Sequence, residues 1–250
     1  MDEYRGRKSL DLELLDVETK INVLYRLVNT AFNESMDALY EKDLSLSKKI
    51  IEEDKKINEL SSEIESLAIN VIRNQTPVAT DIRKLTSHIF VAQELERIGD
   101  YLRGISRINT KIGKEPFITK FEKIPKMEKV AKEMLKMSMK SYLNEKESSG
   151  AVETSKEIFS RDDEIDNLNT QVQQDLIKRM SKNSKIVKQG TYIIWVAHNL
   201  ERISDRSTNI AEYIKQINTQ IKKNEKEAIP IYNLLCISNM QGLFKKKYID

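Results

Sequence analysis

Two pairs of carboxylates occur at the same spacing in two distant parts of the chain. Glu96 and Asp100 are four residues apart, and so are Glu201 and Asp205. In a helix this spacing places both side chains on one face. Like charges so placed cost a helix about 0.2–0.5 kcal/mol, whereas a bound cation would convert the repulsion into ligation. The pattern leaves two interpretations open, a metal site and a solvated acidic face.

The segments that carry these pairs repeat one another. Residues 91–108 read VAQELERIGDYLRGISRI and residues 196–213 read VAHNLERISDRSTNIAEY, so that eight of eighteen positions are identical at an offset of 105 residues. Upstream, residues 54–58 (DKKIN) correspond to residues 162–166 (DDEID) at an offset of 108. The chain is therefore predicted to be a tandem duplication.

Each repeat has a second set of oxygen-bearing side chains on the preceding predicted helix. They are Asp54 and Asn58 in the first repeat and Asp162 and Asp166 in the second. Oxygen ligands without cysteine suit hard cations, or iron and manganese. The second repeat offers four carboxylates and the first offers three with a neutral amide. We therefore expect the second repeat to bind a cation more tightly.

Other polar residues adjoin the carboxylates of the second repeat. His198 lies three residues before Glu201, and Asn209 lies one turn beyond Asp205, so both are candidate additional ligands. Arg97 and Arg202 directly follow the two glutamates. We expect them to relieve part of the repulsion between the carboxylates but to point to another face.

The elements that must position these side chains are helices. Apolar residues recur at helical spacing almost throughout, and Gly (7) and Pro (4) are scarce. The pattern predicts helices over residues 10–43, 45–74, 78–111, 126–146, 149–181 and 185–223.

One apolar stripe in each repeat is predicted to be the core, and the carboxylate rows lie roughly 160° around the helix from it. The rows are therefore expected to face outward or toward a groove. The core residues predicted in this way are Leu95, Ile98, Leu102, Leu200, Ile203 and Ile210.

The break in periodicity at residues 111–116 predicts the boundary between the repeats. We expect an all-α protein of two tandem antiparallel three-helix bundles, without β-structure, that meet near residues 112–120. The first repeat would span 1–116 and the second 117–224. Residues 225–250 would form a C-terminal tail or a short capping helix.

Composition excludes several classes of protein. The 42 basic and 39 acidic residues nearly balance, so nucleic-acid binding has no support. A single cysteine, Cys236, excludes an internal disulfide framework. The N-terminus lacks a signal-peptide pattern, and no run approaches the roughly 18 apolar residues of a membrane span. We expect a cytoplasmic protein without a membrane span.

The repeated motifs resemble those of the PhoU family. The resemblance rests on ELERIGD (94–100) and NLERISD (199–205) as E/DxxxD signatures, with EEDKKINEL (52–60) and SRDDEIDNL (160–168) as companion segments. The segment TPVATDIR (76–83), which leads into the third predicted helix, agrees as well. The resemblance covers roughly residues 10–223.

This resemblance implies a six-helix fold with metal ions on the E/DxxxD surfaces. The ligands carried over by position are Asp54, Glu96, Asp100, Asp162, Asp166, Glu201 and Asp205. Asn58 and Gly104 depart from the second-repeat pattern and leave the first repeat with fewer ligand oxygens. The metal would be iron, manganese, zinc or magnesium.

The resemblance also implies a non-enzymatic regulator of phosphate uptake and signalling. Such a protein negatively regulates a phosphate ABC transporter and its phosphate-sensing histidine kinase, and is commonly a homodimer. The implied partners are the transporter ATPase, the histidine kinase, or both. Two alternatives remain: a helical interaction scaffold without metal, and a carboxylate-bridged metalloenzyme. The second fits poorly, because such enzymes use Glu-x-x-His pairs and neither His88 nor His198 has Glu three positions earlier.

Overall fold

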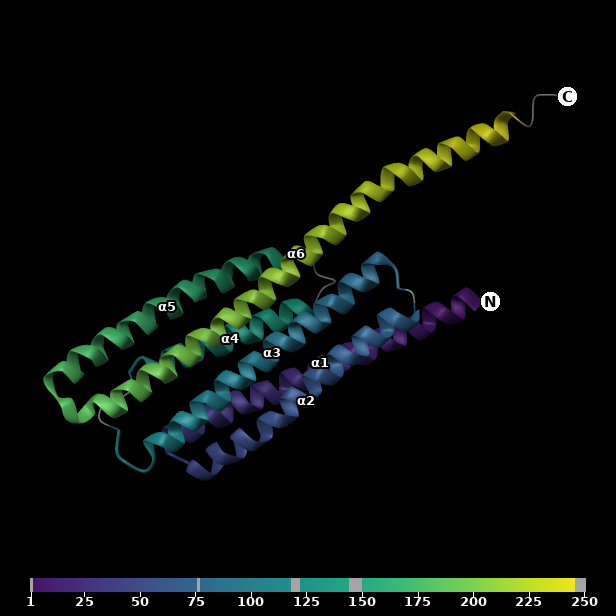
Figure 1. Cartoon of the computed structure of the whole chain (residues 1–250). Coiled ribbons are helices and arrows are strands. Elements are labelled where there is room, and N and C mark those ends of the chain that lie inside the picture. Colours follow the sequence, from purple (N-terminus) through teal and green to yellow (C-terminus); the bar gives the residue numbers. More distant parts are fainter. Residues whose placement is uncertain (1, 76, 118–121, 144–149, 246–250) are drawn as a thin grey trace.

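The computed structural model describes residues 2–75, 77–117, 122–143 and 150–245, and over these ranges it contains helices and no strands (Figure 1). The all-α prediction is confirmed. The elements are α1 (Asp2–Glu41), α2 (Leu44–Gln75), α3 (Ala79–Ile112), α4 (Ile124–Leu143), α5 (Gly150–Lys182), the short 3-10 helix η1 (Ser184–Ile186) and α6 (Val187–Lys245).

Local side-chain chemistry sets several helix ends. The carboxylate of Asp43 accepts hydrogen bonds from the backbone N–H groups of Ser45 (2.9 Å) and Leu46 (2.8 Å), which caps the start of α2. At the end of α3, Gly113 has φ of 72°, a left-handed conformation that glycine adopts readily, and its N–H donates to Asn109. Asp43 thus starts α2 only two residues after α1 ends, and Gly113 ends α3 before the connection to α4.

The helices form two three-helix units that lie side by side, α1–α3 and α4–α6 (Figure 1). The third helices of the two units, α3 and α6, pack against each other in antiparallel directions. Phe90 stacks on Tyr213, with ring centroids 4.1 Å apart, whereas Gly104, farther along α3, lies beside Asn199 of α6. The duplication in the sequence therefore becomes an approximate two-fold arrangement in space.

The C-terminal helix differs from its predicted length. It was expected to end near residue 223, but α6 continues to Lys245 and projects beyond the bundles (Figure 1). Residues 225–245 thus extend α6, with Pro230 inside the helix, and residues 246–250 lie outside the described ranges. The segment 218–229 contains no glycine and many Lys, Glu and Gln residues, which favour helix.

The predicted core is confirmed. Leu95, Ile98 and Leu102 of α3 and Leu200, Ile203 and Ile210 of α6 are fully buried, in one apolar cluster that spans both units. Glu96, Asp100, Glu201 and Asp205 are partly exposed, as their angular position predicted. Among the described residues, no helix has an apolar stretch long enough to cross a bilayer.

Candidate metal centre

The first repeat gathers its carboxylates between α2 and α3 and places an arginine among them. Arg103 Nη1 lies 2.5 Å from Asp54 Oδ2 on α2, and Arg103 Nη2 lies 2.6 Å from Asp100 Oδ1 on α3. The Asp54 side chain is only 4% exposed, and Asn58 donates a hydrogen bond to it (3.3 Å). The guanidinium therefore bridges the same two helices whose carboxylates were expected to share a metal ion.

A glycine allows the close approach of these helices. A Cβ atom added to Gly99 would lie 3.1 Å from Ile57 Cγ2 and 3.7 Å from Asp54 Oδ1. Because Gly99 has no side chain, α2 packs directly against α3 beside Asp100. The equivalent position of the second repeat is Ser204, which is also fully buried.

The carboxylates of the first repeat repel one another. Burial raises the pKa of Asp54, with Arg103 opposing the rise and Asp100 adding to it. Burial also raises the pKa of Glu96, helped by Asp100 and Asp54. The three side chains thus form one electrostatic cluster, as the sequence predicted.

The second repeat gathers four carboxylates, Asp162 and Asp166 on α5 and Glu201 and Asp205 on α6. A hydrogen bond across these two helices runs from Thr208 Oγ1 to Asp162 Oδ1 (3.2 Å). Glu201 Oε2 is buried and accepts no hydrogen bond in the described part of the chain, although His198 Nδ1 lies 3.2 Å from it. A buried carboxylate oxygen without a donor fits a cation ligand, because leaving it unpaired is costly. Asp54 Oδ1 of the first repeat is also buried without a partner among the described residues, so this feature alone does not distinguish the two repeats.

Burial and neighbouring carboxylates also raise pKa values in the second repeat. Burial raises the pKa of Glu201 to about 7, and Asp205 is the next largest cause, with Asp166 and Asp162 contributing as well. The pKa values of Asp162 and Asp166 are also raised, first by burial and then by Asp205. All four carboxylates therefore belong to one cluster.

The raised pKa of Glu201 predicts how the stability of the fold depends on pH. The folded chain takes up this proton near pH 7 and the unfolded chain near 4.5, so the folded state binds more protons between these values. In the presence of chelator, stability should therefore fall as pH rises through this window, by at most about 3 kcal/mol for this group. Glu201→Gln should remove this part of the slope in urea titrations at pH 5 and pH 8, and an unchanged slope would contradict the assignment.

Two expectations about neighbouring residues were wrong. Asn209 does not extend the carboxylate row, because its Nδ2 donates to Glu94 of α3 (3.3 Å). At about 100° per residue, Asn209, which lies eight residues after Glu201, is rotated about 80° around the helix from it. Thr208 lies seven residues after Glu201 and is rotated by only about 20°, so Thr208 continues the row instead. Arg202 was expected to face elsewhere but pairs with Asp205 at 2.5 Å.

The remaining neighbours lie at the edge of these clusters. Arg97, the counterpart of Arg202, pairs with Glu94 and not with the row (3.3 Å). His198 adjoins Glu201 with its side chain 57% exposed, so it lies at the rim of the second cluster.

The donor chemistry of the second repeat fits a hard cation better than that of the first. In the described ranges, no three His, Cys, Asp or Glu side chains are already gathered as ligands of one ion. The second cluster has four mutually repelling carboxylates on two adjoining helices, and these flexible side chains could close around a cation. In the first cluster, the Arg103 guanidinium already neutralises Asp54 and Asp100.

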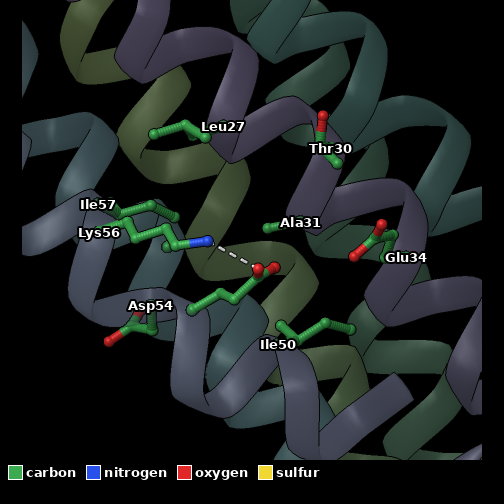
Figure 2. A pocket seen from close by; sticks show the side chains of 10 residues that line it. Leu27, Thr30, Ala31, Glu34, Ile50, Asp54, Lys56 and Ile57 are labelled. Carbon is green, nitrogen blue, oxygen red and sulfur yellow. Dashed lines mark hydrogen bonds and ion pairs between the residues drawn. The ribbon is translucent and has the colours of Figure 1, made fainter.

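A pocket of about 150 Å³ lies next to the first cluster, on the α1 side of α2 (Figure 2). Apolar side chains including Leu27, Ile50 and Ile57 line it, and Lys56 and Glu53 form an ion pair there (2.8 Å). The carboxylate of Asp54 points away from this pair (Figure 2) and toward Arg103 of α3. Asp54 and Gly99 also line the pocket, so the pocket adjoins the carboxylate cluster, but the Asp54 carboxylate is turned toward Arg103.

Arg103 and Thr208 are the two site residues that the sequence interpretation missed. Each lies seven residues after its glutamate, on the same helix face, and the offset of 105 aligns them with each other. Extending the E/DxxxD spacing by three residues would have found both.

Comparisons with known proteins agree with this architecture. The PhoU domain family matches residues 21–108 and 124–214, one match in each three-helix unit. A "Phosphate-specific transport system accessory protein PhoU homolog" of Clostridium acetobutylicum is 28% identical over 207 residues, covering 82% of this chain and 92% of that protein. A homologue with the same description from Streptococcus pneumoniae is 26% identical and covers 85% and 96%.

Solved structures show the same fold. The phosphate transport system regulatory protein PhoU of Streptococcus pneumoniae superposes with a TM-score of 0.75 at 25% identity, covering 84% of this chain and 97% of that chain. PhoU of Pseudomonas aeruginosa superposes with a TM-score of 0.77 at 22% identity, covering 83% and 97%. With two family matches, one per repeat, this chain belongs to the PhoU domain family.

Proposed function

We propose that this protein is a regulatory accessory protein of phosphate uptake and signalling that binds metal through its second repeat. The observation that carries the metal proposal is the cluster of four mutually repelling carboxylates, with the buried, undonated Glu201 Oε2 among them. The family and the names of its relatives support the link to phosphate transport.

Asp162, Asp166, Glu201 and Asp205 would hold the ion, which would be iron, manganese, zinc or magnesium. The bound ion would supply positive charge at this site. The chain's own residues bring carboxylates from α5 and α6 to one place, and Thr208 orients Asp162 through its hydroxyl. Neutralising the cluster would hold α5 against α6 and stabilise the second bundle.

The regulatory role would be negative control of a phosphate ABC transporter when phosphate is sufficient. We propose that the partners are the transporter ATPase, a phosphate-sensing histidine kinase, or both, and that the protein acts in the cytoplasm as a homodimer without catalysis. The relatives that support this role are themselves named as phosphate-specific transport system accessory proteins.

A scaffold without metal is the second candidate function. The pairing of Arg202 with Asp205 favours it, because that ion pair neutralises one of the four carboxylates internally. However, in the part of the chain that the structure describes, Arg202 forms an ion pair with Asp205 and with none of the other three carboxylates. The two candidates differ in whether added metal changes the protein at all.

Affinity capture tests the proposed partners. Tagged chain, once loaded with metal and once treated with chelator, is used as bait in cells shifted between phosphate-rich and phosphate-poor medium. We expect a transporter ATPase or a histidine kinase to be enriched at least about tenfold over a tag-only control in the phosphate-rich cells, a threshold set well above the background of the control. Recovery of neither class of partner in either medium would count against the regulatory proposal.

A further inference from the structure

The two repeats differ in charge at the position seven residues after the motif glutamate of their third helices. Arg103 of α3 and Thr208 of α6 correspond at the offset of 105 that aligns the two carboxylate rows. Each side chain reaches across to the aspartate at the equivalent place on the second helix of its own repeat: Arg103 to Asp54 at 2.5 Å and Thr208 to Asp162 at 3.2 Å. The first repeat thus has a permanent cation beside this aspartate, where the second repeat has a neutral hydroxyl.

Arg103 neutralises two carboxylates of the first repeat, and its contacts with them fix the position of its guanidinium. Its two terminal nitrogens bind carboxylates from two different helices, at 2.5 and 2.6 Å, and its side chain is 25% exposed. Asp54, which it neutralises, is 4% exposed. A charge-assisted fork of this kind is strong and geometrically specific, and removing one partner of a buried pair is costly because the other charge stays buried.

Arg202 does not bridge the carboxylates of the two helices in the second repeat. It reaches Asp205 from three residues away on the same helix and makes no ion pair with the α5 carboxylates in the described ranges. Its counterpart Arg97 turns to Glu94 instead. Across the two helices of each repeat, the charge therefore differs at the Arg103/Thr208 position and at Asn58, which replaces the fourth carboxylate.

We propose that Arg103 is the built-in counter-cation of the first repeat, so that its guanidinium replaces a metal ion there and this chain binds metal through the second repeat alone. The inference rests on the proposed metal binding of the second repeat. It assigns the two halves of the duplication different roles. In the first bundle an arginine permanently neutralises the carboxylates between the second and third helices, and in the second bundle an exchangeable ion does so.

Reciprocal exchange of the two residues tests the inference. The variants are Arg103→Thr and Thr208→Arg, with Arg107→Thr as the matched control, because Arg107 is an exposed arginine one turn further along α3. Bound metal per chain is measured with Mn²⁺ alone by equilibrium dialysis at pH 7.5, and melting is followed by circular dichroism in chelator and in saturating Mn²⁺.

In chelator, Arg103→Thr should melt about 5–10 °C below the wild-type chain because Asp54 loses its partner. Saturating Mn²⁺ should recover this loss, and the variant should bind more Mn²⁺ per chain than the wild type. Adding Asp100→Asn to Arg103→Thr should abolish the extra Mn²⁺. Thr208→Arg, which adds an ion pair instead of removing one, should fold and weaken Mn²⁺ binding at least about tenfold. Arg107→Thr should match the wild type.

The contradicting outcomes separate the inference from the proposed function. If the wild-type chain binds Mn²⁺ and Arg103→Thr binds no more, or if Asp100→Asn alone removes Mn²⁺ from the wild-type chain, the inference fails while the proposed function stands. If no chain binds Mn²⁺, the proposed metal binding fails, and the inference fails with it.

Discussion

Ile203→Ala should lower the free energy of unfolding by about 2–5 kcal/mol, the usual cost of emptying a buried aliphatic site. Ile203 is fully buried in the cluster that both bundles share, so its removal leaves a cavity in a close-packed interior. Urea titration of the purified chain, followed by circular dichroism, measures the loss.

Glu201→Gln is the matched control, because Glu201 lies on the same helix two residues away but faces the carboxylate cluster. In the metal-free chain this change should cost little, and above pH 7 it should stabilise the fold because it removes a repelled charge. Equal destabilisation by the two substitutions would show that the apolar stripe and the carboxylate row are not separated as described.

Added metal should raise the melting temperature of the wild-type chain. An ion that binds only the folded state stabilises it by about 2.7 kcal/mol at a hundredfold excess over Kd, which corresponds to roughly 5–10 °C for a chain of this size. Asp205→Asn should remove more of this rise than Asp100→Asn, because Asp205 belongs to the cluster of four carboxylates and Asp100 already pairs with Arg103.

The same rise should depend on pH. Ligation requires the deprotonated carboxylate, and the pKa of Glu201 is about 7. The metal-induced rise should therefore begin to weaken below pH 7 and be lost toward pH 4. Melting scans at pH 8, 6 and 4, each with chelator and with saturating Mn²⁺, measure it. A rise of the same size at pH 4 would mean that carboxylates are not the ligands.

Most of the fold could be predicted from periodicity. The apolar stripes through Leu95 and Leu200 identified the buried faces, and the repeat predicted two equivalent bundles. The end of α6 could not be found in this way, because neither a cap nor a glycine marks residue 223, and Pro230 does not end the helix. Helix termini depend on local hydrogen bonding more than on periodicity.

The candidate site was predicted in part. The i,i+4 spacing predicted that Glu96 and Asp100, and Glu201 and Asp205, lie on a helix face away from the core, and all four side chains are partly exposed. Arg103 was missed because its partner Asp54 lies 49 residues away along the chain, and such a pairing depends on how two helices pack. Asn209 was misplaced because the drift of about 40° at each i,i+4 step accumulates over two steps.

Metal content is the most direct test of the account. The wild-type, Asp100→Asn and Asp205→Asn chains are equilibrated with Mn²⁺ at pH 7.5, freed of unbound ion, and analysed for metal per chain. The account predicts bound metal in the wild type, nearly the same amount in Asp100→Asn, and a loss of most of it in Asp205→Asn. Equal metal in all three chains, or none in the wild type, would contradict a metal centre in the second repeat.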